Sequence, residues 1–402
     1  MNSTPELRIA VIGAGPVGLA LGLHAARALP RAKIALFDAR PVERDVSADP
    51  RTLALALGSV QLLQRLQCWP AAQATPIETV HVSQAPPSVE GGEVRLQARD
   101  LHVPMLGAVI AYGPLVSALQ TAWCAEEAAS RGRLRSRFGA AVSGLKSWAG
   151  SGSQDSSAQG VEVDAGIAET FDLAVVAEGG VFADQARKAL SQDYRQTAWV
   201  GTATLEGGQA GTAFERFTHQ GPVALLPLGA EGPGRLRAAL VWCAASDDDP
   251  VEPLNDTQRI AVLNHLLPAA AGRVVALSPL KRFALGLNAE RSLVSGRQVR
   301  IGNAAQTLHP VAGQGLNLGL RDAFSLVQAL RFEPDVDRAL RRVEWQRAPD
   351  RWSTIATTDF LARSFTWRWP GVSAARGLGL GLMQAIPPLQ RVLARQMMFG
   401  RR

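Results

Sequence analysis

A glycine-rich turn near the N-terminus constrains the fold more than any other feature of this chain. The turn, Gly13-Ala14-Gly15-Pro16-Val17-Gly18, has GxGxxG spacing and joins the apolar run 8–12 to the helical pattern 16–29. The first glycine permits a tight turn, the second lets the backbone approach a pyrophosphate, and the third lets the helix pack on the strand. The segment therefore predicts a strand–turn–helix unit whose helix N-terminus can face a phosphate.

An acidic residue stands at the distance that a dinucleotide site needs. The apolar run 33–37 predicts a second strand that ends at Asp38, 20 residues beyond Gly18. A carboxylate there can accept hydrogen bonds from a ribose hydroxyl. Glycines alone could form a purely structural turn, but the strand, the helix and the acid together predict dinucleotide binding.

Composition narrows the class of protein further. The chain has 402 residues, 47% of them hydrophobic, which predicts two closely associated globular domains. The formal net charge of +7 fits a basic face, or attraction to an anionic cofactor or membrane surface. No basic run with interleaved aromatics is present, so we expect no nucleic acid partner. Three widely separated cysteines predict neither disulfides nor a metal site, and they fit a reducing cytoplasm.

Weaker patterns organise the middle of the chain. Residues 51–66 and 115–129 have helical spacing, and residues 195–285 alternate short β-like runs with one helical insert. No apolar stretch reaches the roughly 20 residues that a membrane-spanning helix needs.

A second glycine-rich turn lies in residues 301–323. It contains Gly302-Asn303 after a predicted strand, His309-Pro310, and then Gly313-Gln314-Gly315-Leu316-Asn317 at the start of a strong helical pattern. A helix N-terminus of this kind can stabilise the negative charge of a reduced flavin, and Asn303 can hydrogen-bond a sugar-like chain.

At these residues the chain resembles the class A FAD-dependent aromatic hydroxylases, and specifically their ubiquinone-biosynthesis (polyprenyl-phenol hydroxylase) branch. The resemblance spans nearly the whole chain. It depends on the first turn with Asp38 and on residues 301–323, whose Gly-Asn is typical of this branch where most class A enzymes have Gly-Asp. The other matching segments are 49–55, 172–179, 213–217 and 221–228.

The resemblance implies an α/β fold: a Rossmann-like, GR2-type FAD-binding domain, an interleaved antiparallel-sheet substrate domain and a helical C-terminus. The expected FAD-binding segments are 1–75, 111–190 and 291–335. The expected substrate-domain segments are 76–110 and 191–290, and residues 336–402 form the C-terminal helical region.

The resemblance also implies roles for single residues. The first turn and Asp38 would bind the ADP half of FAD, Val142 would contact adenine through its backbone, and Arg51 would lie near the flavin and pyrophosphate. Asn303 would face the pyrophosphate–ribityl region, and the second turn would line the pyrimidine edge of the flavin. The expected cofactor-binding residues are Gly13, Ala14, Gly15, Pro16, Val17, Gly18, Asp38, Arg51, Val142, Glu178, Gly179, Gly302, Asn303, Pro310, Gly313, Gly315, Leu316 and Asn317.

In this family NAD(P)H reduces FAD, and O2 then gives a flavin C4a-hydroperoxide that hydroxylates an electron-rich ring. Because the cofactor carries the reacting oxygen, we expect no catalytic side chain. His309 could assist proton movement or fix its loop by a hydrogen bond, and both interpretations stay open.

Three departures from the family pattern bear on turnover. Glu178-Gly179 replaces the usual Asp-Gly, Tyr112-Gly113-Pro114 lacks the Arg often found there, and Trp345-Gln346-Arg347 only partly matches the usual Tyr and Arg. The leading hypothesis is an NAD(P)H- and FAD-dependent hydroxylase of a polyprenylated phenol in ubiquinone biosynthesis. The alternatives are a non-catalytic flavoprotein or scaffold of a ubiquinone-biosynthesis complex, and a hydroxylase of a soluble aromatic metabolite.

The C-terminal tail, residues 371–400, mixes apolar residues with arginines. It predicts either two helices packed on the body or a basic amphipathic surface that touches a membrane. We therefore expect a cytoplasmic protein, with peripheral contact to the inner membrane in the second case.

Overall fold

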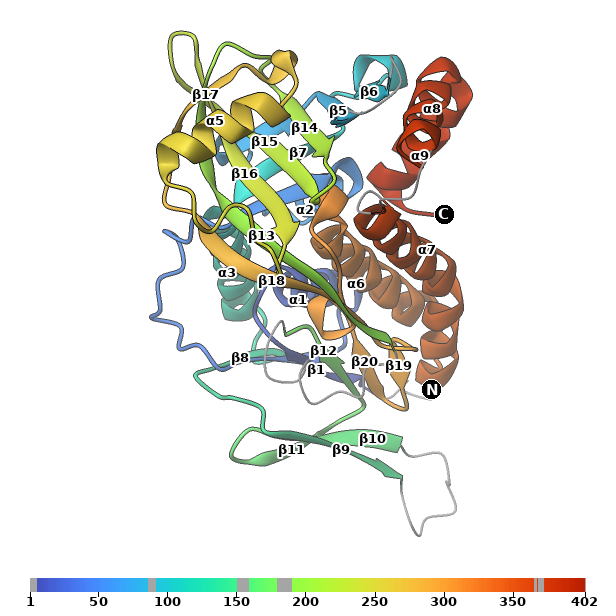
Figure 1. The fold of residues 1–402 in the computed structure, drawn as a ribbon. Helices are drawn as coiled ribbons and strands as arrows, with labels where there is room; N and C mark the ends of the chain where they lie inside the picture. The colour runs from blue at the N-terminus through green and yellow to red at the C-terminus, as the bar shows by residue number, and fades with distance from the viewer. Residues whose placement is uncertain are drawn as a thin grey trace.

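The computed structural model describes residues 6–85, 92–149, 159–178, 190–364, 367 and 372–401. Two large β-sheets and a group of helices make up the chain (Figure 1), and the predicted α/β fold is confirmed. The larger sheet lies above the smaller one in Figure 1, and the C-terminal helices lie along one side of both.

The smaller sheet has six strands in the order β19-β20-β12-β1-β2-β8. All neighbours pair in parallel except β19 and β20. Its strands are β1 (Arg8–Ile12), β2 (Lys33–Asp38), β8 (Leu134–Phe138), β12 (Leu173–Val176), β19 (Val294–Ser295) and β20 (Gln298–Arg300).

Strand β1 lies at the centre of this sheet, and its alternating side chains enter two separate cores. Ile9 and Val11 join the core formed with the helices α1 (Pro16–Ala28), α3 (Tyr112–Ala129) and α6 (Gln314–Phe332). Ala10 and Ile12 point to the other face. A three-stranded sheet covers that face, with strands β9 (Gly144–Ala149), β10 (Gln159–Asp164) and β11 (Ala168–Phe171). This two-sided burial explains the unbroken apolar run of β1.

The larger sheet is mixed and has nine strands. Its core lies between one face of the sheet and the helix α5 (Asp256–Leu266). Its strands are β5 (Thr79–Gln84), β6 (Glu93–Gln97), β13 (Leu190–Glu206), β14 (Thr212–Phe217), β15 (Pro222–Gly232), β16 (Arg235–Ala245), β17 (Arg273–Leu277), β18 (Lys281–Ala289) and β21 (Gln306–Thr307).

The prediction of one helix over residues 51–66 was wrong in its first part. Residues Thr52–Ala56 form β3, and the helix α2 covers only Leu57–Arg65. Strand β3 pairs with β7 (Gly107–Ala111), which also pairs with β4 (Ala74–Ile77). Leu53 and Leu57 fit a helical spacing, but pairing with β7 satisfies the backbone of β3, and this tertiary contact overrides the local pattern.

Four helices form the C-terminal part of the chain. The helix α6 is followed by α7 (Val336–Ser364), α8 (Val372–Ala385) and α9 (Pro387–Phe399). Helix α7 packs along α6, α8 packs on β6, and α9 packs on α2 (Figure 1). Short 3-10 helices are η1 (Ala71–Gln73), η2 (Arg99–Leu101), η3 (Ala269–Ala271), η4 (Gly302–Ala304) and η5 (Val311–Gly313).

Candidate functional site

The first glycine turn connects β1 to α1 at the carboxyl end of the parallel strands. Gly13 has φ +103°, and its N–H donates to Phe37 O of β2 at 2.7 Å. Asp38, at the end of β2, accepts from the N–H of Ala14 at 2.6 Å. The turn and the acidic residue are therefore in direct contact, as the sequence spacing indicated.

Arg40 completes this first turn and was missed by the sequence prediction. Its Nε lies 3.0 Å from Asp38 Oδ1, and its Nη2 donates to Ala14 O at 2.8 Å. A cationic residue two positions after the strand-ending acid, close enough to pair with it, is the signal that could have identified Arg40. Asp38 thus organises the loop itself, and Arg40 adds a cation beside the start of α1.

The second and third glycines of the turn meet different surroundings. A Cβ at Gly18 would lie 1.9 Å from Gly13 O, so this glycine is needed for α1 to pack on the turn. A Cβ at Gly15 would lie 3.9 Å from Tyr112 Oη and within 4 Å of no other described residue outside its own turn. Helix α1 also begins without a side-chain cap, so its first N–H groups are available to an anion. These features fit the diphosphate of FAD.

Arg51 lies next to the same opening. It forms an ion pair with Asp49 at 2.8 Å, and its guanidinium stacks on the Tyr112 ring with 4.0 Å to the centroid. Tyr112 begins α3, at the place where the family often has an Arg. The structure therefore holds a cation near Gly15 by stacking Arg51 on this tyrosine.

Glu178, two residues after β12, packs against the first turn. A Cβ at Gly13 would lie 2.7 Å from Glu178 Cγ, so the longer acidic side chain covers this glycine. Burial raises the pKa of Glu178, and the nearby carboxylate of Asp38 raises it further. Gly179 lies outside the described residues. Val142 is buried in the core on the β9–β11 side, beside Ile12 and Phe37.

The second glycine turn lies directly beside the first. A Cβ at Gly319 would lie 2.7 Å from Gly302 Cα and 3.0 Å from Val17 Cγ2. Gly302 itself has φ +61° and also faces Val17. Helices α6 and α1 and the 3-10 helix η4 therefore meet at these three residues, and two motifs nearly 300 residues apart form one site. Asn303 lies exposed on η4.

Gly313, with φ +58°, is the N-cap residue of α6, and it provides no side-chain cap for this helix. A Cβ at Gly315, in its first turn, would be within 4 Å of no described residue outside that helix turn. The helix α5, by contrast, begins with a complete capping box between Asn255 and Gln258. The starts of α1 and α6 thus share an open, uncapped geometry that suits a ligand with negative charge. Leu316 is partly buried behind this opening.

Asn317 fixes the start of α6 to β3 and α2. Its Oδ1 accepts from Ala56 N and from Ser59 Oγ, both at 2.7 Å. Its Nδ2 donates to Ala54 O at 3.0 Å and to Gly313 O at 2.9 Å. All four hydrogen-bonding positions of the amide are used inside the protein, so its side chain positions the turn.

His309 is held in one tautomer by its surroundings. The N–H of Val311 donates to its Nδ1 at 3.1 Å, so the proton lies on Nε2, which donates to Gln196 Oε1 at 2.9 Å. Burial lowers the pKa of His309 to about 4, so the ring is neutral at pH 7. This arrangement fits the loop-fixing interpretation. Pro310, the next residue, is exposed. Gln196 of β13 was not predicted, because only the fold brings it here.

Within the described part of the chain, no group of three or more His, Cys, Asp and Glu residues could hold a metal ion. The hydrogen-bond donors around both turns are backbone N–H groups, arginine guanidinium groups and side-chain amides, which suit phosphate groups and the edges of a flavin.

Comparisons with known proteins identify FAD-binding relatives of this chain. The family described as FAD binding domain matches residues 183–367, which include the second turn. Ubiquinone hydroxylase UbiL of Rhodospirillum rubrum is 36% identical over 214 residues, covering 51% of this chain and 48% of UbiL. The 3-demethoxyubiquinol 3-hydroxylase of Escherichia coli is 28% identical and covers 97% of this chain and 98% of its own.

The fold has solved counterparts. Klebsiella pneumoniae HpxO, whose structure contains FAD and uric acid, aligns with a TM-score of 0.68 and 16% identity over 96% of this chain and 97% of HpxO. HpxO shows that the fold is shared, and the FAD binding domain match together with the named relatives confirms the predicted resemblance. The named relatives favour the hydroxylase hypothesis over a scaffold.

Proposed function

We propose that this chain, an FAD-dependent monooxygenase related to the hydroxylases of ubiquinone biosynthesis, uses NAD(P)H and O2 to hydroxylate the ring of a polyprenylated phenol. Bound FAD supplies the redox and oxygen chemistry. The first turn, with Asp38 and Arg40, would hold its ADP half. The second turn would hold its ring system. The match to UbiL spans only about half of each chain. The substrate is therefore inferred from the residues of this site.

One observation carries the substrate class: an apolar hollow of about 90 Å³ at the start of α6. Leu55 of β3 and Leu106 line it from the strand side, and Met397 and Met398 of α9 line it from the tail. Gln314 lies at its α6 end. An apolar wall beside the flavin turn suits a prenylated ring and excludes water from the reacting atoms.

The protein's own residues then act by position and charge. Asn317 holds the α6 N-terminus in place, so that the N–H groups of its first turn can stabilise negative charge on the flavin edge. His309 stays neutral and fixes the adjoining loop. Arg51, stacked on Tyr112, supplies a positioned cation for the phosphate side.

The activity can be tested with purified, FAD-loaded protein and a short-chain prenylated phenol. We expect NAD(P)H oxidation, O2 consumption and a product heavier by one oxygen atom. The variant Met397→Lys, which places a charge in the hollow, should raise KM for the prenylated phenol by roughly tenfold or more. Gln390→Lys, on the same helix outside the hollow, should not. NAD(P)H oxidation without a hydroxylated product, or preference for a soluble aromatic acid, would contradict the proposal.

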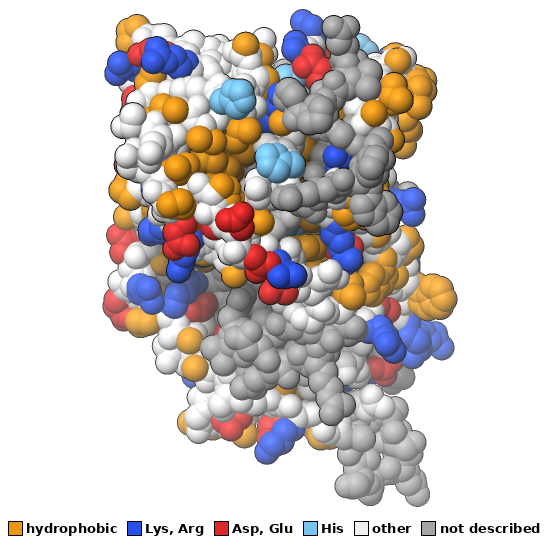
Figure 2. Space-filling model, in the orientation of Figure 1, with side chains coloured by type: hydrophobic (Ala, Val, Ile, Leu, Met, Phe, Trp, Pro, Cys, Tyr) orange, Lys and Arg blue, Asp and Glu red, His pale blue; other side chains and the backbone are white. Residues whose placement is uncertain are grey.

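A lipid-borne substrate also gives the C-terminal tail a function. No helix among the described residues is both long and apolar enough to cross a membrane. Five apolar side chains are nevertheless exposed on α8 and α9, the region at the upper right of Figure 2. This tail patch consists of Leu378, Leu382, Ile386, Leu389 and Val392, with Leu378, Leu382 and Val392 at least 60% exposed. We propose that the tail patch lies on an anionic membrane surface, near Arg391 and Arg395.

Flotation with vesicles tests the tail patch. The wild-type protein should float with phosphatidylglycerol vesicles, and a Leu378→Ser, Leu382→Ser, Val392→Ser variant should not. Phe332→Ser is the matched control, because Phe332 is 66% exposed at the end of α6 and outside the patch. Equal flotation of all three proteins would remove the patch from membrane binding.

A further inference from the structure

A large cavity lies on the far side of α6 from β21 and η4. It has a volume of about 520 Å³ and is lined by α2, α6, α7 and the C-terminal end of α9. Four arginines line it: Arg65, Arg321, Arg347 and Arg401. No Asp or Glu is among its lining residues in the described part of the chain. We call this cavity the arginine pocket.

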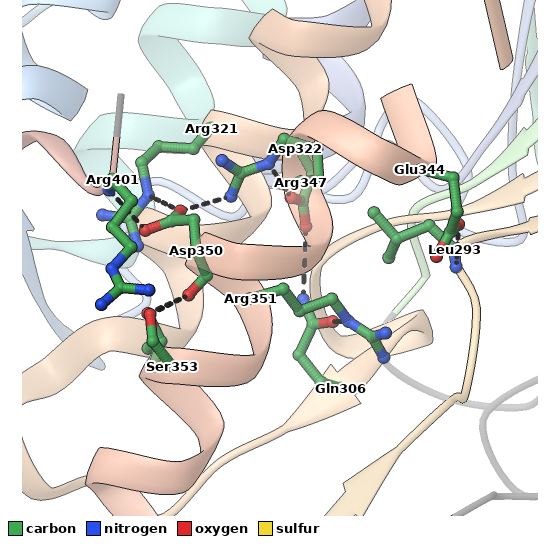
Figure 3. Close-up of polar contacts among 11 residues, drawn as sticks. Leu293, Gln306, Arg321, Asp322, Glu344, Arg347, Asp350, Arg351, Ser353 and Arg401 are labelled. Atoms are coloured by element: carbon green, nitrogen blue, oxygen red, sulfur yellow. Dashed lines mark hydrogen bonds and ion pairs between the residues drawn. The ribbon is translucent and has the colours of Figure 1, made fainter. Parts of the chain in front are cut away.

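Two of the arginines that line the pocket, Arg321 and Arg347, share one carboxylate. Asp350 lies behind the wall, and Figure 3 shows three groups converging on it. Arg321 Nε and Arg347 Nη2 reach the same oxygen, Oδ2, at 3.0 and 2.6 Å, and the N–H of Arg401 donates to Oδ1 at 2.8 Å. Arg347 also pairs with Asp322 at 2.7 Å. Asp322 therefore pairs with Arg347, whereas Arg321 shares Asp350 with Arg347.

Arg321 is the group that most needs another anion. Its side chain is only 14% exposed, and its Nη1 is buried with no hydrogen-bond partner among the described residues. Burial lowers the pKa of Arg321, which reflects the free-energy cost of keeping its charge out of water. A buried donor without a partner is costly, and an anion bound in the pocket that Arg321 lines would add a partner for this guanidinium.

Two glycines let the C-terminal residues close one wall of the pocket. A Cβ at Gly58 would lie 2.8 Å from Met398 O, so this glycine lets the end of α9 approach α2. Gly400 has φ +73°, and a Cβ there would lie 2.7 Å from Asp350 Oδ1. Both glycines are needed to seat the C-terminal residues, including Arg401, against the arginine pocket.

The pocket is separate from the proposed flavin site. Asn317 lies one helical turn before Arg321 on α6, and its four hydrogen bonds close the space between α6, β3 and α2. The apolar hollow lies on the β3 side of Asn317, and the arginine pocket lies on the α7 side.

We propose that the arginine pocket binds a phosphate group carried by a partly apolar ligand. A guanidinium group can bind two phosphate oxygens at once, and Arg321 and Arg65 line two sides of the pocket, Arg321 with a donor that has no partner among the described residues. Leu62 and Phe324 line the remaining wall and suit an acyl chain or a planar ring. The phosphate could belong to an anionic phospholipid headgroup or to a free nucleotide, and the two sources share this chemistry.

The test uses full-length protein with FAD bound, so that the flavin site is filled. Calorimetric titration with inorganic pyrophosphate, and separately with soluble short-chain phosphatidylglycerol, should show saturable binding to the wild type. Arg321→Met should weaken binding by roughly tenfold or more, because charged hydrogen bonds are lost. Arg65→Gln, at the exposed rim, should weaken it about three- to tenfold without risk to the buried cluster.

Arg342→Gln is the matched control, since Arg342 is exposed on α7 and does not line the pocket. It should bind as the wild type does. Binding of the lipid alone assigns the site to a headgroup with its acyl chain, and binding of both probes assigns it to phosphate as such. If neither probe binds the wild type, or if Arg321→Met and Arg65→Gln both bind unchanged, the proposal is wrong. None of these outcomes depends on turnover.

Discussion

The two glycine turns do similar work but are held by different means. The first turn is fixed by its own neighbourhood. Within 28 residues of chain, Gly13 bonds to Phe37, and Ala14, Asp38 and Arg40 bond to one another. The second turn is fixed by distant segments, since Asn317 bonds to Ala56, 261 residues away. One end of the site is therefore a local structure, and the other exists only when the whole chain is folded.

The two turns should therefore respond differently to mutations elsewhere in the chain. The first turn should keep its geometry as long as the β1–α1–β2 unit is intact. The second turn depends on β3, α2 and β13, and β13 runs through the larger sheet and meets His309 through Gln196. Changes in the larger sheet can therefore reach the second turn through this hydrogen bond.

The largest expected effect comes from glycines where the two turns meet. Gly319→Ala places a Cβ 2.7 Å from Gly302 Cα, so α6 must move away from η4 and α1. We expect a loss of about 3 kcal/mol in the free energy of unfolding and loss of bound FAD. Urea unfolding of the apoprotein and flavin fluorescence after gel filtration measure these two quantities.

Gly315→Ala is the control within the same helix. Its Cβ would meet open space, so the fold should be kept and the helix slightly favoured, by about 0.5–1 kcal/mol. FAD affinity should nevertheless fall, because the new methyl group occupies the opening at the α6 N-terminus. Unchanged FAD affinity in Gly315→Ala would place the flavin elsewhere.

An intermediate effect is expected at Asn317. Asn317→Ala leaves Ala56 N–H and the Ala54 and Gly313 carbonyls without their partner and should destabilise the protein by about 1–3 kcal/mol. Asn317→Asp keeps both accepting contacts but places its second carboxylate oxygen against the carbonyls of Ala54 and Gly313, so at pH 7 it should be at least as unstable as Asn317→Ala. Urea unfolding with the flavin removed measures this order. If Asn317→Asp is as stable as the wild type, the two donating contacts do not hold the turn.

The sequence predicted the local parts of this site well and the tertiary parts poorly. The contact of Asp38 with the first turn follows from motif spacing, as does the start of α1 at Pro16. The break between β3 and α2 could not be predicted, because pairing with β7 decides it. Gln196 and the sharing of Asp350 by Arg321 and Arg347 are likewise set by packing between segments far apart in the chain.

The smallest expected effect tests the acidic substitution at the first turn. The pKa of Glu178 is raised in the folded protein, first by burial and then by Asp38, so folding favours its protonated form. The stabilisation is full below the unfolded pKa, near the ordinary value of 4.5, and is lost as the pH rises through the folded pKa. At pH 8 the ionised side chain therefore destabilises the folded protein.

Glu178→Gln cannot ionise, so its Tm should exceed that of the wild type at pH 8, and the difference should disappear below about pH 4.5. FAD affinity at pH 8 should also rise, because one negative charge is removed beside the turn that faces the diphosphate. Glu162→Gln is the control, because Glu162 lies on β10 with its side chain 38% exposed, and it should show neither change. A Tm difference that is the same at both pH values would mean that the ionisation of Glu178 does not set the stability of the first turn.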